Sequence, residues 1–247
     1  MALSKGWTDT VDDGLTNAAW DAYDALIQAE VGPCACTAQD AGYNPRFIED
    51  ISTGYACVDW KLFKALLWVE SGGPKNRAWK TRPFQIGNPH DKAYPILKKA
   101  AEGSAAIMSD ALTREIKTGS IDTPALNVKA GIAYLFTRMA KFEIRSVLDD
   151  KDRTTYIETV RHGDSFDTIA RRVGTTVEVL RKFQQSSGNL IRVGQKLQYQ
   201  KARMAQVVAG WRTWDFATIA DRYNGGGDVD YAEKLKYVHG LFGKPKR

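Results

Sequence analysis

The sequence of 247 residues has little of what defines several large classes of proteins. It contains no run of about 18 apolar residues, the length that a membrane-spanning helix needs. The opening segment MALSKGWTDTVDDG has no apolar stretch behind its lysine, so we expect no secretory signal peptide. With three cysteines and three histidines, it also lacks the paired spacings of a zinc site. We therefore expect a protein that is soluble as made and uses neither a metal nor another cofactor.

The charge is moderately positive. Lysine and arginine number 35 against 29 acidic residues, a formal net charge of +6. Such an excess favours anionic partners, but no block of consecutive basic residues is present, so a nucleic-acid partner is not expected. The hydrophobic and charged shares, 43% and 26%, are those of a globular protein and exclude a disordered chain. The length predicts one domain plus a small module.

The three cysteines leave two interpretations open. In a reducing cytosol, Cys34, Cys36 and Cys57 would be structural thiols. After export to an oxidising compartment, Cys57 could form a disulfide with either Cys34 or Cys36.

Most of the chain has helical periodicity. Before about residue 148 we predict no strand, and helices over residues 15–27, 58–70, 93–101, 104–117 and 128–142. The helix over 58–70 should end at Ser71-Gly72-Gly73-Pro74, because glycine frees the backbone and proline cannot continue a helix. Further helices are predicted over 202–208, 216–223 and 231–241.

A different pattern lies between these helical parts. Residues 156–160 and 195–199 are predicted strands, and two helices are predicted between them, over 166–173 and up to residue 183. Thr176 is the expected N-cap of the second helix. Because helical sequence flanks this β-α-α-β unit on both sides, we predict an insertion. The expected boundaries are 1–150 and 202–247 for a split helical domain and 151–201 for the inserted module.

The inserted unit resembles the LysM family, small modules that bind glycans containing N-acetylglucosamine. The matching segments are Gly163-Asp164-Ser165-Phe166 and Ile191-x-x-Gly194-Gln195-x-Leu197. Where the family usually has asparagine near the end of its second helix, this chain has Gln184-Gln185. The resemblance implies a sugar groove between two loops that contain Gly163, Asp164, Ser165, Asn189, Leu190 and Ile191.

The flanking helical sequence resembles the soluble lytic transglycosylase family, whose members have a lysozyme-like helical fold. The resemblance rests on Glu70-Ser71 at a helix end, Pro83-Phe84-Gln85-Ile86, Asn127-x-x-x-Gly131-x-x-Tyr134-Leu135, and Ala220-x-x-Tyr223-Asn224-Gly225-Gly226-Gly227 followed by Tyr231-x-x-x-Leu235. Arg82-Pro83 stands where the family has glycine and leucine. The implied fold is mainly α, a lysozyme-like domain of α+β type with an inserted βααβ LysM module.

The resemblance implies that Glu70 is the catalytic acid. It ends an apolar helix, so its carboxyl can be partly desolvated, which raises the pKa of a carboxyl. No second carboxylate has a motif position, although ordinary glycosidases need two. One carboxylate suits the family's reaction, in which the bond between N-acetylmuramic acid and N-acetylglucosamine is cleaved. The muramic C6 hydroxyl attacks C1 and leaves a 1,6-anhydro end, and no water is consumed.

Supporting roles follow from the same resemblance. Tyr223 would form a hydrogen bond near Glu70 or the acetamido group, and Gln85 and Asn224 would hold sugar hydroxyls or amides. Ser71 either donates to the sugar or caps the helix, and Tyr134 either contacts substrate or belongs to the core.

Three basic residues also have two possible roles. Arg77, Lys80 and Arg82 either meet lactyl or peptide carboxylates or are simply solvated charges.

The sequence is compatible with three functions. The first is a peptidoglycan lytic transglycosylase targeted by LysM, the second a hydrolytic muramidase of the same fold, and the third a non-catalytic peptidoglycan-binding protein. The expected partner is the glycan strand, and an immunity or secretion-system protein is a further candidate. The protein would be made in the cytoplasm and act in the periplasm or cell wall, delivered as an antibacterial effector by type VI-like secretion or as an endolysin through a phage holin.

Overall fold

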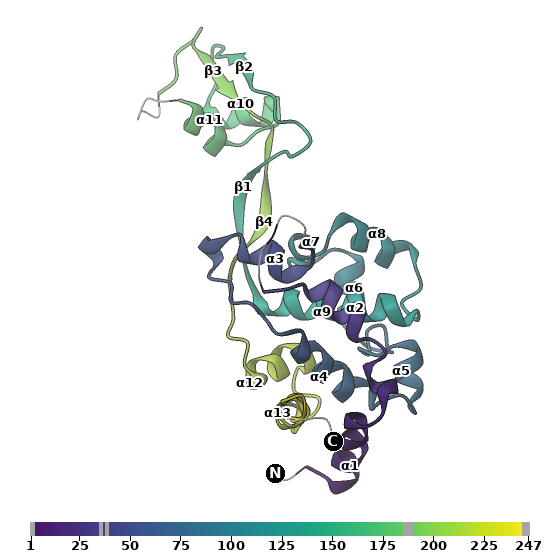
Figure 1. Cartoon of the computed structure of the whole chain (residues 1–247). Coiled ribbons are helices and arrows are strands. Elements are labelled where there is room, and N and C mark those ends of the chain that lie inside the picture. Colours follow the sequence, from purple (N-terminus) through teal and green to yellow (C-terminus); the bar gives the residue numbers. More distant parts are fainter. Residues whose placement is uncertain (1–2, 35–36, 38–39, 185–189, 244–247) are drawn as a thin grey trace. The chain divides into compact units, whose positions relative to one another are not determined.

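The computed structural model describes residues 3–34, 37, 40–184 and 190–243 (Figure 1). Helices make up 51% of it and strands 12%, which confirms the expected mainly helical class. The chain divides into two compact units, one formed by Met1–Phe142 with Val208–Arg247 and the other by Glu143–Val207. Within the described residues, no helix is long and apolar enough to cross a membrane.

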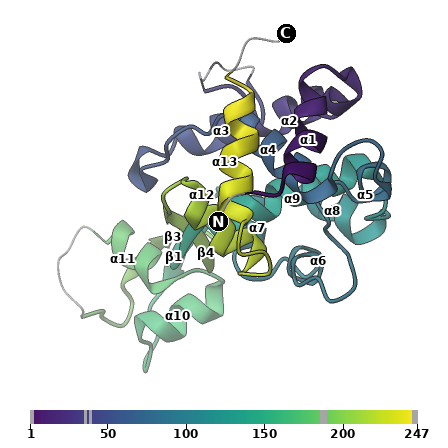
Figure 2. The ribbon, with the colours of Figure 1, turned by 90° about the horizontal axis from the view of Figure 1, so that it is seen from below.

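The first unit is helical. Its first half contains α1 (Lys5–Asp12), η1 (Asp13–Leu15), η2 (Ala18–Asp21), α2 (Asp24–Val31), α3 (Tyr43–Ile48), η3 (Ile51–Thr53), α4 (Trp60–Ser71) and α5 (Arg77–Thr81). Its second half contains α6 (Ala93–Lys98), α7 (Ser104–Ile107), α8 (Asp110–Thr118), α9 (Pro124–Met139), α12 (Phe216–Ile219), the π-helical turn η4 (Ala220–Asn224) and α13 (Tyr231–Leu241). Each of the helices α4 and α9 carries more buried residues than any other helix of the unit, and α13 packs along α4 (Figure 2).

The ends of α4 follow from its sequence. At the start, the Asp59 side chain accepts a hydrogen bond from the Lys61 backbone N–H at 3.0 Å, as an N-cap does. At the end, Gly72 adopts φ 66° and donates its N–H to the Trp68 carbonyl at 3.0 Å, so the helix terminates in the left-handed conformation that glycine allows. The predicted helix over 58–70 is thereby confirmed within two residues, and Glu70 lies in its last turn.

Two of the predicted helices are partly or wholly wrong. The helix predicted over 128–142 ends at Met139 and is followed by strand β1 (Ala140–Leu148), and residues 202–208 lie in strand β4 (Ala202–Trp211). The two strands form a two-stranded sheet, so the expectation of no strand before about residue 148 is also wrong. The physical reason is that each strand's hydrogen-bond partner lies about sixty residues away, where a short sequence window cannot detect it.

Polar caps also divide two long predicted helices. Residues 15–27 form η1, η2 and the start of α2, because the Asn17 side chain accepts from the Ala19 N–H at 3.0 Å and starts a separate turn. Residues 104–117 are split at Met108, whose ψ of 145° is extended, and Ser109 caps α8. Apolar periodicity continues across these breaks, which is why it did not reveal them.

The second unit contains the predicted β-α-α-β order. Its elements are β2 (Tyr156–Thr159), α10 (Phe166–Val173), α11 (Val177–Phe183) and β3 (Lys196–Tyr199). Strands β2 and β3 are antiparallel, with Tyr156 opposite Tyr199. Ser165 and Thr168 form a capping box on α10, and Thr176 caps α11 as predicted. Phe166 belongs to a small core of its own within this unit.

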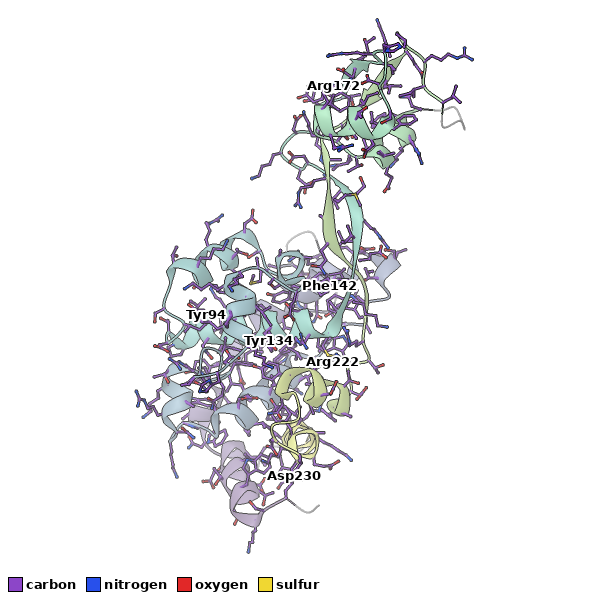
Figure 3. All side chains as sticks on the ribbon, turned by 180° about the vertical axis from the view of Figure 1, so that it is seen from behind. Tyr94, Tyr134, Phe142, Arg172, Arg222 and Asp230 are labelled. Atoms are coloured by element: carbon purple, nitrogen blue, oxygen red, sulfur yellow. A yellow bond between two sulfur atoms is a disulfide. The ribbon has the colours of Figure 1, made fainter. Side chains whose placement is uncertain are left out.

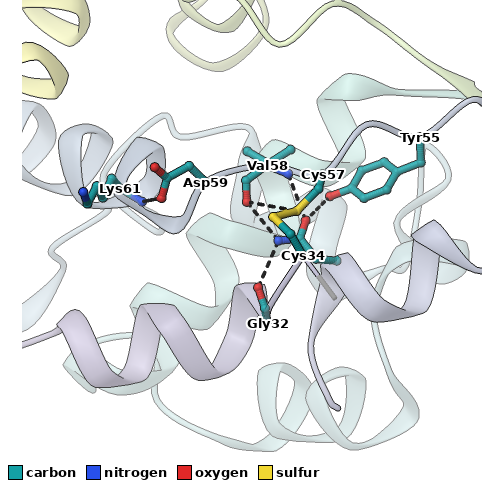
Figure 4. The surroundings of a disulfide bond; sticks show 8 residues. Gly32, Cys34, Tyr55, Cys57, Val58, Asp59 and Lys61 are labelled. Carbon is teal, nitrogen blue, oxygen red and sulfur yellow. Dashed lines mark hydrogen bonds between the residues drawn. A yellow bond between two sulfur atoms is a disulfide. The ribbon is translucent and has the colours of Figure 1, made fainter. Parts of the chain in front are cut away.

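A disulfide fastens the loop that precedes α4 (Figure 4). It joins Cys34 to Cys57, with Cα atoms 5.5 Å apart. The same two chain segments are joined by the buried Asn44 amide, which donates to the carbonyls of Gly32, at 3.0 Å, and Val58, at 2.9 Å. Of the two predicted pairings the one with Cys34 is formed, and Cys36 lies outside the described residues.

Candidate active site

A pocket of about 430 Å³ in the first unit contains Glu70. Among the residues that line it are four of those predicted to bind substrate, namely Gln85, Tyr134, Tyr223 and Asn224. They come from the segment after α5, from α9 and from η4, and Figure 3 marks Tyr134 together with Arg222, which lines the same pocket. The fold thus brings together residues that are separated by more than 150 positions.

The carboxyl of Glu70 is adapted to hold a proton near neutral pH. Its pKa is raised to about 7, and burial is the largest cause. The Tyr231 hydroxyl lowers this pKa by donating a hydrogen bond to Oε1, and the negative charges of Asp228 and Asp91 contribute to raising it. Both protonation states are therefore populated at neutral pH. A carboxyl with such a pKa can give a proton and take one back.

Tyr231, the residue that contacts this carboxyl, was not among the predicted site residues. It begins α13 and is 3% exposed. The available signal was its place in the motif Tyr231-x-x-x-Leu235, which contributed to the family resemblance but was given no role in the site. Tyr223, expected to form a hydrogen bond near Glu70 or to the acetamido group, donates its hydroxyl to the Phe84 carbonyl at 3.0 Å.

Gln85 adopts an uncommon backbone conformation at the rim of the pocket. Its φ is 59°, which for a residue other than glycine costs roughly 1–3 kcal/mol and persists only where neighbours hold it. Its Nε2 donates to the backbone carbonyl of Glu70 at 2.7 Å, and Asn88 donates to its Oε1. The side chain therefore fastens this segment to the end of α4.

The preceding residue, Phe84, is fixed by α9. The Asn127 side chain accepts from the Phe84 N–H at 2.9 Å and donates to the Ile86 carbonyl at 2.8 Å. A Cβ atom at Gly131 would lie 2.3 Å from the Phe84 ring, so only glycine allows this approach. The motif around Asn127 thus shapes the pocket by holding the segment that contains Gln85.

Three other predicted residues make contacts within the fold. Ser71 is fully buried, its hydroxyl donates to the Leu67 carbonyl at 2.6 Å and accepts from the Gly73 N–H at 3.4 Å, and it does not line the pocket. The Asn224 side chain lines the pocket but also accepts from the Asp228 N–H at 2.7 Å. The Tyr134 ring packs edge-to-face on Tyr223 at 5.6 Å.

Sequence motifs single out Glu70 alone, but Asp91 and Asp221 also line the pocket. The two oxygens of Asp91 accept hydrogen bonds from the backbone N–H groups of Gly87, Ala93 and Tyr94 at 2.6, 2.8 and 3.1 Å. These bonds hold the Asp91 carboxyl in a fixed orientation at the start of α6.

The predicted glycan loops of the second unit are partly described. Gly163 has φ 82°, and Asp164 accepts from the Arg161 N–H at 2.8 Å and pairs with Arg172 at 2.7 Å, so Arg172 holds the pKa of Asp164 at about 2. Ser165 caps α10. In the opposite loop Leu190 is 83% exposed and Ile191 packs against the small core, while Asn189 lies outside the described residues.

Comparison with known families identifies one part of the chain. Residues 159–199 match the LysM domain family. No curated protein and no solved structure matches the chain. The second unit therefore contains a LysM domain, a module that binds peptidoglycan and related carbohydrates.

Proposed function

We propose that the protein is a lytic transglycosylase that cleaves the glycan strands of peptidoglycan and is held on the wall by its LysM domain. The observation that supports this most strongly is the carboxyl of Glu70, which has a pKa of about 7 in a polar pocket beside Tyr231. A wall-binding domain in the same chain supports peptidoglycan as the substrate.

In the proposed reaction, protonated Glu70 gives its proton to the oxygen between N-acetylmuramic acid and N-acetylglucosamine. The bond from C1 to that oxygen breaks, and the glucosamine part leaves as an alcohol. The Glu70 carboxylate then takes the proton of the muramic C6 hydroxyl while the oxygen of that hydroxyl forms a bond to C1. Tyr231 donates to the carboxylate while it is charged. Such acid–base assistance typically contributes about 10²–10⁴-fold to the rate.

The test is the chemistry of the product ends. Digested sacculi should yield 1,6-anhydro-muropeptides, which are one water lighter than hydrolysis products and resist borohydride reduction. Mass analysis before and after reduction measures this. Reducible muramic ends throughout the digest would reject the transglycosylase.

Asp91 supports a second candidate, a hydrolytic muramidase. A second carboxylate in the pocket of the acid could activate water. Three backbone N–H groups already occupy its oxygens, so this carboxyl is engaged in holding the start of α6, and we prefer the first proposal. The same product analysis separates the two.

The pH profile should respond in opposite directions to two substitutions near Glu70. Tyr231→Phe removes a hydrogen bond that lowers the Glu70 pKa, so the alkaline limb of kcat/KM should move up by about 0.5–1 unit. Asp228→Asn removes a negative charge that raises this pKa, so the limb should move down. Because the acid must be protonated, activity falls as pH rises through the pKa.

Tyr237→Phe is the matched control for Tyr231→Phe. Tyr237 lies on the same helix, and its hydroxyl donates to Asp12 at 2.9 Å. This substitution should leave the alkaline limb of kcat/KM unchanged. If the two substitutions around Glu70 shifted the limb in the same direction, Glu70 would not be the group that titrates.

The LysM domain should supply wall affinity without being needed for the helical fold. The Asp149 N–H donates to the Lys201 carbonyl at 2.8 Å, so a short Gly/Ser turn can replace residues 150–200. We expect this deletion to weaken cosedimentation with sacculi and to leave helical circular dichroism and a cooperative melt. An unfolded product would show that the first unit depends on the module.

We further propose that the protein acts in the periplasm or cell wall, an oxidising location that suits the bond between Cys34 and Cys57. Delivery by type VI-like secretion or through a phage holin, and an immunity or secretion-system partner, remain predictions from the sequence.

A further inference from the structure

A second pocket adjoins the one that contains Glu70. It has a volume of about 410 Å³ and is lined by α5 and the segment after it, together with Asp122. Gln85 lines both pockets, so the two pockets meet at this residue. A substituent of a sugar bound next to Glu70 can therefore extend into the second pocket.

The charge of this second pocket is positive. Arg77 and Arg82 contribute two guanidinium groups, and Asp122 contributes one carboxylate. Arg82 bonds Asp122 through Nε and donates from Nη1 to the Asn88 oxygen at 3.1 Å, which fixes the plane of its guanidinium. Within the described part of the chain, no hydrogen bond or ion pair holds the exposed Arg77 guanidinium. One fixed and one available guanidinium make a site for an anion with paired oxygens.

The substrate in the proposed reaction has such a group. N-acetylmuramic acid carries a lactyl side chain at C3, which ends in a carboxylate or continues into a peptide stem with carboxylates of its own. N-acetylglucosamine has neither. We infer that the pocket formed by Arg77, Arg82 and Asn88 binds a carboxylate carried by the muramic acid next to Glu70. This inference rests on the proposed function and names the part of the substrate that the site recognises.

The bound carboxylate would also be connected to the acid. Arg82 holds Asn88, Asn88 donates to Gln85, and Gln85 donates to the Glu70 backbone carbonyl at 2.7 Å. Arg82 is thus both a ligand and a positioning residue, so Arg77 is the cleaner residue to test.

The experiment compares Arg77→Gln with Lys80→Gln in the full chain. Both remove one exposed positive charge from α5, but Lys80 does not line the pocket. On strands with free carboxylates, Arg77→Gln should raise KM about three- to fivefold with kcat nearly unchanged. The expected effect is small because an exposed ion pair contributes little binding energy. Lys80→Gln should leave both constants unchanged.

Three substrates identify the carboxylate. They are strands with intact stems, strands freed of stems by an amidase, and intact strands whose carboxylates have been converted to neutral methylamides. A larger effect of Arg77→Gln on the first indicates a stem carboxylate, and a larger effect on the second the lactyl carboxylate. On the third, wild type should show the raised KM and Arg77→Gln should add nothing further.

An equal KM for wild type and Arg77→Gln on all three substrates would overturn the inference. If wild type releases no product at all, the proposed function has failed instead. Calorimetric binding of a disaccharide peptide then tests the pocket alone, since affinity should fall in Arg77→Gln and not in Lys80→Gln.

Discussion

Glu70→Gln is expected to lower the release of muropeptides from sacculi by about 10²–10⁴-fold. The amide keeps the size of the side chain and an oxygen that can accept from Tyr231, but it cannot give or take a proton. Binding to sacculi should be unchanged, because the LysM domain is untouched. Initial rates of release and cosedimentation measure the two effects separately.

The same substitution should stabilise the protein in mild alkali. A carboxyl whose pKa is raised to about 7 in the folded state binds its proton more tightly there than in the unfolded chain. The stability it contributes is complete below pH 4.5 and is lost as pH rises through 7. At pH 8, Glu70→Gln should therefore raise the free energy of unfolding by on the order of 2–3 kcal/mol relative to wild type.

Glu233→Gln provides the matched control. Glu233 is an exposed glutamate on α13 and does not line the pocket. It should change neither activity nor the pH dependence of stability. Residual activity of Glu70→Gln within a few-fold of wild type would remove Glu70 as the catalytic acid and leave the non-catalytic wall-binding protein as the better hypothesis.

Reduction of the disulfide is expected to cost about 3 kcal/mol of stability. The bond between Cys34 and Cys57 closes a loop with a sequence separation of 23, and chain entropy gives roughly this value for such a loop. The bridge and the buried Asn44 join the same two chain segments, so loss of the bridge should loosen the segment ahead of the helix that carries Glu70.

Thermal melting with and without reductant measures this effect, and Cys57→Ser should melt like reduced wild type. Cys36→Ser is the control and should melt like oxidised wild type. Under denaturing conditions, oxidised protein should show one reactive thiol per chain. Three reactive thiols after air oxidation, or equal melting with and without reductant, would show that the bond contributes nothing.

The sequence was most informative where structure is local. Helices α10 and α13 have the predicted bounds, and α11 begins at its predicted cap Thr176, because capping side chains and glycine stops act within four residues. The LysM domain was recognisable for the same reason, since its fold is closed within about 45 residues and its turn motifs stand at fixed separations. Glu70 was placed at the end of a helix by Gly72.

Contacts between residues that are far apart in the sequence could not be predicted from the sequence. Strands β1 and β4 were not predicted because the hydrogen-bond partner of each lies on the other side of the intervening module in the sequence. Tyr231 lies 161 residues from Glu70, and neither its hydroxyl bond nor the pocket carboxylate of Asp91 has a local signal. Tyr223 lines the pocket, but its hydroxyl bonds the Phe84 carbonyl and not the acid.

The division has a physical cause. Contacts between residues close in the chain determine the helix ends, the turns and the small module. The local sequence is therefore sufficient to predict them. The protonation of Glu70 is decided by desolvation and by three groups, Tyr231, Asp228 and Asp91, that tertiary packing brings to it. The sequence motif was sufficient to identify Glu70 as the candidate acid. Only the assembled pocket sets its pKa to about 7, because burial and the electrostatic effect of neighbouring charges depend on distances in space.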